Sequence, residues 1–309
     1  METYTFEVKE DAIPSRLDQY LAAVYPVPVT RSHIKKLMEK GLVFVDGQAA
    51  KPNHKVKPGE KIEVISEETV PSGIVPENID LDIIYEDDDI IVVNKQPGIA
   101  VHPGAGIRSG TLVNALLNHS GNLSDISEGR PGLVHRLDKD TSGVIVVAKN
   151  NRSHAELARQ FKSREVKKNY LALVKGIVET DSGIIDLPIG RHPSNRQKMS
   201  VRHDSQRGAV TEYRVIKRFD GFTLVMLDLK TGRTHQIRVH MSYIGHPVLG
   251  DEKYGSKGKF SRQALHSYYL RLRHPATGKE MEFYAGLPSD MKNIIGPSYS
   301  NILLLTKPF

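Results

Sequence analysis

Apolar residues in this chain occur in short runs, and this feature limits the possible folds more than any other. Such runs recur at 90–93, 144–148, 170–174 and 222–229, with a weaker one at 133–134. Runs of about four to eight residues bounded by polar segments are typical of β-strands. No run approaches the roughly 20 apolar residues that span a bilayer. The sequence therefore predicts a strand-rich globular protein.

The charge balance points to a polyanionic partner. The chain of 309 residues has a formal net charge of +7 and a pI of about 9.3. Each Lys or Arg placed on a phosphate releases a counterion, so such a balance favours nucleic acid. The chain has no Trp and 8 Phe. Stacking on bases would therefore fall to Tyr, His or Arg.

The absence of cysteine removes several chemistries. With no Cys in the sequence, disulfides, thiolate catalysis and Cys-based zinc sites are excluded. The first residues, METYTFEVKEDA, are polar and acidic and do not form a secretory signal. A reducing, cytoplasmic location is the simplest expectation.

Residues 1–68 are expected to form a small domain of two helices and short strands. The pattern Ser-x-x-Asp at Ser15 and Asp18 indicates the start of a first helix. A second helix is expected from about Thr30, and the pair Asp46-Gly47 suits a two-residue hairpin turn. Basic side chains flank this turn on both sides, at Arg31, Lys35, Lys36, Lys51 and Lys55.

The remainder of the chain is expected to form one larger domain. Residues 69–80 contain two prolines and a glycine and are predicted to be a linker, so the domain would span 81–309. Helices are expected after Thr111 and from Ser153, where Ser153 and Glu156 match a capping box.

Three other patterns do not support a metal or cofactor site. The glycines from Gly104 to Gly110 have the spacing GxGxxxG, not the GxGxxG of dinucleotide loops. The segment 140–143 (DTSG) would need a second copy to form an aspartic-protease pair, and the chain has none. A group at His235, His240 and His246 fits no metal signature. We therefore expect no cofactor and no bound metal.

The segment 132–148 is the most informative part of the chain. It reads as a strand, a tight polar loop and a second strand, with Asp138 expected where the first strand ends. Such positions present reactive groups on a rigid scaffold. An aspartate there, taken alone, is more often a turn-forming residue than a reactive group.

The neighbours of Asp138 carry a family resemblance. The loop His135-Arg136-Leu137-Asp138, followed by Thr141-Ser142-Gly143, resembles the signature loop of RluA-type RNA pseudouridine synthases. Lys168-Asn169-Tyr170 is similar to their tyrosine strand, and 231–240 (TGRTHQIRVH) to their arginine motif. Gly250-Asp251 and Tyr254-Gly255 are similar to a following loop.

The N-terminal segment resembles an S4 RNA-binding domain. The similarity runs through 16–18 (RLD), 30–32 (TRS), 45–47 (VDG) and 51–52 (KP). The two resemblances together cover nearly the whole chain. They are strongest toward the RluD branch of the family, which modifies large-subunit ribosomal RNA.

The resemblance implies a fold and an activity. The fold would be α+β, with a small S4 (αL-type) domain and a mixed, mainly antiparallel sheet domain flanked by helices. The activity would be the isomerisation of uridine to pseudouridine in structured RNA, most of all 23S ribosomal RNA, without a cofactor. The alternatives are pseudouridylation of transfer RNA and a non-catalytic RNA-binding or ribosome-assembly factor. A monomer is the expected state.

The resemblance also implies roles for individual residues. Asp138 would be the essential carboxylate, acting at C1′ or at C2′ of the sugar. Arg238 would hold Asp138 ionised, and Tyr170 would stack on the uracil and assist removal of the C5 proton. Because the target base must leave its helix, Arg136 would fill the vacated space. The other expected substrate contacts are His135, Arg233 and His235.

Overall fold

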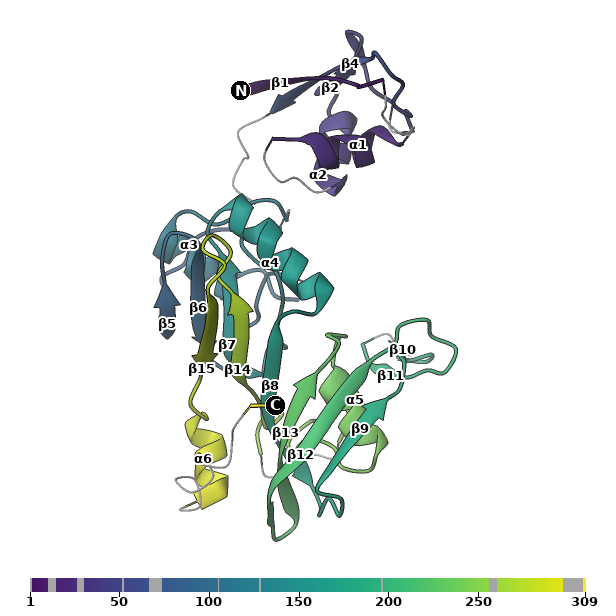
Figure 1. Cartoon of the computed structure of the whole chain (residues 1–309). Coiled ribbons are helices and arrows are strands. Elements are labelled where there is room, and N and C mark those ends of the chain that lie inside the picture. Colours follow the sequence, from purple (N-terminus) through teal and green to yellow (C-terminus); the bar gives the residue numbers. More distant parts are fainter. Residues whose placement is uncertain are drawn as a thin grey trace.

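The computed structural model of the chain contains a small N-terminal unit and a larger sheet unit (Figure 1). It describes residues 2–10, 15–26, 31–51, 53–66, 74–104, 106–127, 129–195, 197–255, 260–296 and 308–309.

The N-terminal unit packs two helices against a four-stranded antiparallel sheet of order β1-β4-β2-β3. Its elements are β1 (Glu2–Glu7), α1 (Leu17–Val24), α2 (Arg31–Glu39), β2 (Val43–Val45), β3 (Gln48–Ala49) and β4 (Lys61–Ser66). Leu17, Leu21 and Ile34 from the helices meet Ile62 and Val64 of β4 in a separate core. The two helices and the short strands follow the sequence prediction.

The turn between β2 and β3 has the predicted conformation. Asp46 and Gly47 have φ values of 49° and 77°, which two-residue hairpin turns require. The capping pattern at Ser15 is wrong. Arg16 is the residue before α1, with no side-chain cap. The carboxylate of Asp18 instead accepts hydrogen bonds from Arg16 and Arg31, because two guanidinium groups compete for it.

The predicted linker falls partly outside the described residues, since 67–73 are not described. Residues 74–80 form no helix or strand, yet they are bound to the larger unit. Asn114 Nδ2 donates to the carbonyl of Val75 at 2.7 Å, and the Gly110 N–H donates to the carboxylate of Glu77. This part of the segment is therefore anchored beside the helix that contains Asn114.

The larger unit is built on a nine-stranded sheet. Its order is β5-β6-β7-β14-β8-β13-β12-β9, and β15 pairs with β14. The strands are β5 (Ile83–Glu86), β6 (Ile90–Lys95), β7 (Ser142–Ala148), β8 (Lys167–Lys175), β9 (Ser182–Asp186), β12 (Val210–Phe219), β13 (Phe222–Leu229), β14 (Leu265–Arg273) and β15 (Glu280–Tyr284). All pairs are antiparallel except β7 with β14. The mixed, mainly antiparallel α+β prediction is confirmed.

Four helices and a small hairpin complete this unit. They are α3 (Leu112–Ser120), α4 (Asn151–Ser163), α5 (Gln236–Tyr243), α6 (Ser289–Ile295), and the strands β10 (Ile189–Arg191) and β11 (Met199–Val201). The helix expected after Thr111 is α3, and the Thr111 side chain caps it. The capping box at Ser153 is wrong, because α4 is capped by Asn150 and the Ser153 hydroxyl donates to Asp89. No helix in the described ranges is long and apolar enough to cross a membrane.

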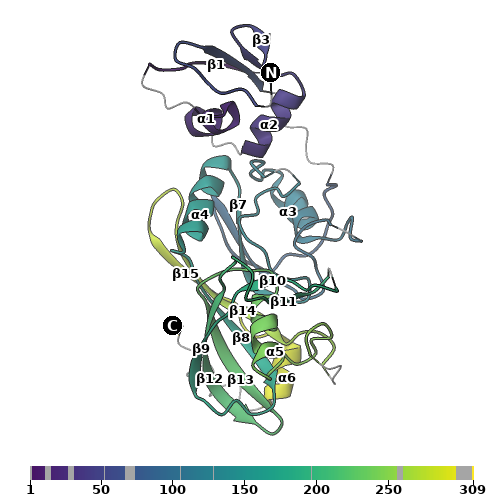
Figure 2. The same cartoon turned by 90° about the vertical axis from the view of Figure 1, so that its right-hand side faces the viewer.

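The unbroken apolar runs of β6 and β7 reflect burial on both faces of the sheet. Ile145 and Val147 point into one core together with Leu116 of α3. Val146 points into the other core together with Leu157 of α4. Side chains alternate between the faces of a strand, so a strand covered on both sides is apolar throughout. Figure 2 shows α3 and α4 on opposite sides of β7.

The strand predicted at Leu133–Val134 is wrong. Leu133 forms only an isolated bridge with Val147, although Ala148 donates to the carbonyl of Gly132. The next backbone donor of β7, the Val146 N–H, binds the ring Nε2 of His135 at 3.0 Å. A side chain thus takes the place of a backbone partner and ends the ladder. Asp138 consequently lies in an irregular loop that enters β7.

The end of this loop needs the glycine of its motif. Gly143 has a φ of 109° and lies beside β14. A Cβ atom at Gly143 would lie 2.1 Å from the carbonyl oxygen of Ser267, which no side chain can tolerate. The close approach of two backbones explains this glycine and fixes where the loop begins to pair with β14.

Candidate active site

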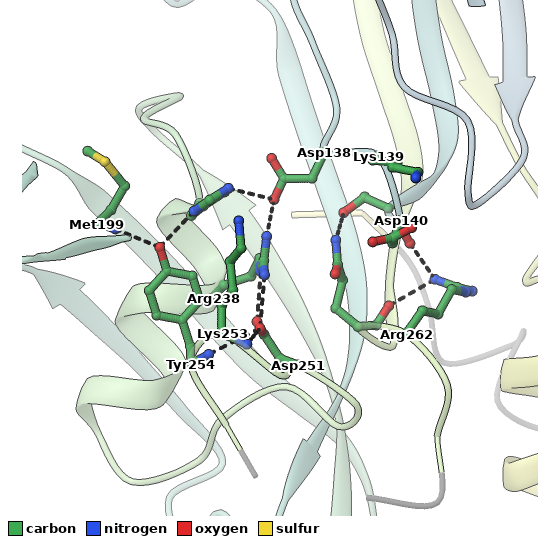
Figure 3. A network of polar contacts seen from close by, with 12 residues as sticks. Asp138, Lys139, Asp140, Met199, Arg238, Asp251, Lys253, Tyr254 and Arg262 are labelled. Carbon is green, nitrogen blue, oxygen red and sulfur yellow. Dashed lines mark hydrogen bonds and ion pairs between the residues drawn. The ribbon is translucent and has the colours of Figure 1, made fainter. Parts of the chain in front are cut away.

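Asp138 and Arg238 form the centre of the site (Figure 3). Arg238, in the first turn of α5, donates from Nη1 to Asp138 Oδ2 at 2.8 Å, across 100 residues of sequence. The Arg238 side chain is 7% exposed and that of Asp138 is 21% exposed. A charged hydrogen bond in such a setting fixes the orientation of the carboxylate.

Asp251 holds Arg238 from the other side. Arg238 donates to its two oxygens from Nε at 2.7 Å and from Nη2 at 2.9 Å. The fully buried Asp251 also accepts the N–H groups of Lys253 and Tyr254. Burial lowers the pKa of Arg238, but Asp251 and Asp138 outweigh it, and the pKa is raised. Sequence reasoning gave Asp251 no role, although the Gly250-Asp251 motif was the available signal.

His235 and Tyr254 approach the same carboxylate. Tyr254 Oη accepts the Met199 N–H at 2.7 Å and lies 2.7 Å from His235 Nδ1. Donation of the phenol proton to Nδ1 leaves His235 Nε2 as an N–H, 3.8 Å from Asp138 Oδ2. Burial lowers the pKa of His235, which favours the neutral ring. Sequence reasoning also missed Tyr254, whose ring packs on the Arg238 guanidinium at 5.1 Å.

The loop that carries Asp138 is fixed from behind by two cations. Arg262 donates to the carbonyl of Asp140 at 2.9 Å (Figure 3). The buried Lys95 ammonium donates to the carbonyls of Gln96, Ile99 and Lys139 at 2.8, 2.9 and 2.9 Å. Burial lowers the pKa of Lys95 to about 7. Sequence reasoning missed Lys95 because β6 otherwise reads as an apolar strand.

Tyr170 forms part of the wall of the pocket that contains Asp138. The residue is 7% exposed. Burial raises the pKa of Tyr170 to about 12, with a smaller contribution from Asp138. The side chain is therefore a neutral phenol near pH 7. It presents an aromatic surface to the pocket rather than a phenolate.

The expected substrate contacts His135, Arg136 and Arg233 all line the same pocket, but their surroundings differ. His135 accepts the Val146 N–H and stacks on Phe161 at 4.6 Å, and burial lowers its pKa to about 3. The ring of His135 therefore supports the structure around β7. Arg136 is exposed, and Arg233 donates from Nε to the carbonyl of Gly208.

The pocket has a volume of about 490 Å³, which is within the range of small-molecule sites. Among the described residues that line it, Asp138 is the one carboxylate and the other charged residues are cations. They are Arg136, Lys162, Arg164, Lys168, Lys230, Arg233 and Arg238. Such a lining suits an anionic ligand whose reacting atoms are brought to one carboxylate.

The predicted S4 contacts lie on the N-terminal unit. Arg31 is ion-paired with Asp18 at 2.9 Å, and Lys35 lies 3.7 Å from Glu39. The other three, Lys36, Lys51 and Lys55, are exposed.

The histidines considered for a metal do not come together. His240 binds Thr211 and the carbonyl of Leu187, whereas His246 contacts the carbonyl of Lys175. A different group could place ligand atoms within 4.8 Å of one another, formed by Asp87, Asp89 and His274. None of these three lines the pocket, and hydrogen bonds from protein donors already engage both carboxylates.

A basic chain with one carboxylate in a cationic pocket is suited to an enzyme that acts on a polyanion such as RNA, and the comparisons with known proteins agree with that class. The family model described as RNA pseudouridylate synthase matches residues 89–243, and that of the S4 domain matches residues 15–62. The chain belongs to the RNA pseudouridylate synthase family and is an RNA pseudouridine synthase, an isomerase that acts on RNA.

Relatives at high coverage support this assignment. An uncharacterized RNA pseudouridine synthase of Aquifex aeolicus is 47% identical over 93% of this chain and 95% of that protein. The ribosomal large subunit pseudouridine synthase D of Pasteurella multocida is 43% identical over 95% and 94%. The solved structure of human RNA pseudouridylate synthase domain containing 1 is 31% identical, with a TM-score of 0.57, over 67% of this chain and 83% of that one.

Proposed function

We propose that this enzyme isomerises specific uridines of large-subunit (23S) ribosomal RNA, with Asp138 as its essential carboxylate. The observation that carries the chemistry is the Asp138–Arg238 pair at 2.8 Å inside the cationic pocket. The substrate follows from relatives named ribosomal large subunit pseudouridine synthase D and from the S4 domain. We propose domains at 1–68 and 81–309 joined by a linker at 69–80, in a cytoplasmic monomer.

The contacts of Asp138 support a proposal for the oxygen that reacts. Arg238 and His235 both approach Oδ2, and no hydrogen bond to Oδ1 is found among the described residues. Oδ1 is therefore the atom that meets the sugar, by attack on C1′ or by removal of the C2′ proton. In either case the N1–C1′ bond breaks, the C5–C1′ bond forms, and the proton lost at C5 is balanced by one gained at N1.

Tyr170 and Arg136 act on the base. With a pKa of about 12, Tyr170 supplies a neutral ring against which the uracil packs, since every base has a π-face. Arg136 is exposed at the pocket and fills the space that the extruded nucleotide leaves in its helix. Arg233 contacts the RNA at the pocket mouth.

His235 and Tyr254 position Asp138. The backbone of His235 has a φ of 57°. This left-handed conformation is uncommon outside glycine and is concentrated at functional sites. The neutral imidazole presents Nε2–H to Asp138, and Tyr254 sets that tautomer. We assign His235 to the carboxylate rather than to the RNA backbone, and His135 to the support of the loop.

The test replaces one carboxylate and maps the product. Cells lacking the gene are complemented with wild type, Asp138→Asn or Asp140→Asn, and pseudouridine is mapped across ribosomal and transfer RNA. Asp138→Asn should leave the sites unmodified, whereas Asp140→Asn, on the same loop, should restore them. Turnover of purified Asp138→Asn within about tenfold of wild type, a barrier change of about 1.4 kcal/mol, would remove Asp138 from the central role. Loss of pseudouridine from transfer RNA alone would contradict the proposed ribosomal RNA substrate.

A further inference from the structure

Three cations of the pocket come from the end of α4 and the start of β8. Lys162 lies in the last turn of α4, Arg164 ends that helix, and Lys168 lies on β8, two residues before Tyr170. All three line the pocket that contains Asp138. We call these three residues the α4 rim. In the described part of the chain, no ion pair involves any of them.

Lys168 is partly desolvated without a carboxylate partner. Its ammonium lies 5.6 Å from the centre of the Phe161 ring, and burial lowers the pKa of Lys168 despite the attraction of Asp228. Asp228 itself is engaged by Lys230 at 2.5 Å. A cation removed from water without a counter-ion is costly. Such a group is best explained by an anion that arrives with the substrate.

Arg164 is held in a conformation that its side chain disfavours. It has φ 62° and ψ 28° where α4 ends, a left-handed position that glycine or asparagine normally occupies. Of the three non-glycine residues with positive φ in the described ranges, two, Arg164 and His235, line the pocket. An arginine at this position carries a backbone cost that glycine would avoid, which is consistent with a use for its charge.

We propose that Lys162, Arg164 and Lys168 bind a backbone phosphate of the RNA next to the target uridine. This inference rests on the proposed placement of that uridine between Asp138 and Tyr170. Lys168 and Tyr170 project from the same face of β8, about 7 Å apart along the strand, which is on the scale of one nucleotide. Phosphate is the chemistry that three clustered cations recognise.

A structural role for the rim makes a different prediction. Lys162 near the end of α4 would stabilise the helix dipole, and Arg164 would serve only as a helix terminus. Arg164→Gly separates the two explanations, because glycine relieves the left-handed backbone but removes the cation. We expect Arg164→Gly to unfold at an equal or higher denaturant concentration than wild type and to bind RNA more weakly. A loss of stability with unchanged affinity would overturn the proposal for Arg164.

The affinity test uses full-length protein that binds without turnover. In an Asp138→Asn background, RNA binding is measured over a salt series for Lys168→Met, Arg164→Gly and Lys175→Met. Lys175 is an exposed lysine at the other end of β8, outside the pocket, so it is the control. Each rim variant should flatten the slope of log affinity against log salt by about 0.7 to 0.9 per contact. Slopes equal to that of Lys175→Met would overturn the proposal.

The location of the phosphate is tested by removing its charge. Target RNAs that contain a single neutral methylphosphonate are prepared, with the substitution moved one position at a time around the uridine. One substitution should weaken binding of the Asp138→Asn protein by about tenfold, yet weaken it little when Lys168→Met is added. Equal losses in both proteins at every position would show that Lys168 does not meet a phosphate.

The same RNA without substitutions separates this inference from the proposed function. If the wild-type enzyme forms no pseudouridine in it, the proposed substrate is wrong. If pseudouridine forms and the methylphosphonate losses stay independent of Lys168, only the phosphate site is wrong.

Discussion

Two groups of charged residues at the pocket differ in how their charges are paired. The Asp138 network (Asp138, Arg238, Asp251, His235 and Tyr254) is connected through close polar contacts. The three cations of the α4 rim have no ion pair among the described residues. Groups that must be aligned at the moment of reaction are fixed in advance. Groups that bind the substrate backbone are left for the substrate to neutralise.

The largest effect is expected where the Asp138 network is most buried. Asp251→Ala leaves the Arg238 guanidinium buried without its bidentate partner, which should cost about 3–5 kcal/mol of unfolding free energy and abolish turnover. Denaturant titration and a single-turnover assay measure the two effects. Asp204→Ala is the control, because its carboxylate is 66% exposed beside Arg202, and exposed pairs contribute at most about 1 kcal/mol. Equal losses of unfolding free energy in Asp251→Ala and Asp204→Ala would show that the buried pair is no more important than the exposed one.

A smaller effect is expected from Tyr254→Phe. The change removes the hydroxyl that joins Met199 to His235, so the partly buried Met199 N–H loses its acceptor at a cost of about 1 kcal/mol. We expect kcat to fall by about 10- to 100-fold, a barrier increase of about 1.4–2.7 kcal/mol, with KM nearly unchanged. His235→Gln should lower kcat similarly, and the double variant little further. A rise in KM with constant kcat would instead place His235 on the RNA.

Removal of residues 1–68 should act on binding alone. The cut keeps residues 74–80, which are bound beside α3. The shortened protein loses the phosphate contacts of the N-terminal unit, so the slope of log affinity against log salt should flatten by about 0.7 to 0.9 per contact. Single-turnover rates at saturating RNA should persist. Circular dichroism establishes that the shortened chain is folded. A folded chain without activity at saturation would show that the N-terminal unit is needed for chemistry.

The smallest effect is expected from chelation. No member of the Asp138 network needs a metal to hold its position, so treatment with EDTA and dialysis should leave the rate within error. The assay compares treated and untreated enzyme on the same folded RNA. Loss of activity that added Zn²⁺ restores would contradict a metal-free reaction and would direct attention to Asp87, Asp89 and His274.

The local patterns of the chain determined much of the fold. The apolar runs at 144–148 and 222–229 are strands, because burial on both faces of a sheet leaves a continuous apolar signal in the sequence. Asp46-Gly47 forms its turn for equally local reasons, since few residues tolerate positive φ. The identities proposed for Asp138, Tyr170 and Arg238 were also available from motif resemblance, before any distance was known.

Only the tertiary structure decided how those residues work together. Asp138, in the loop before β7, pairs with Arg238 of α5 across 100 residues of sequence. Asp251, in the loop after α5, binds the same guanidinium group. The capping patterns at Ser15 and Ser153 were misleading because distant or neighbouring groups competed for the same side chains. The strand expected at Leu133 failed because the ring of His135 took a backbone hydrogen bond. Sequence periodicity records which face of an element is buried, but the partner that a polar side chain finds depends on how the sheet brings separate elements together.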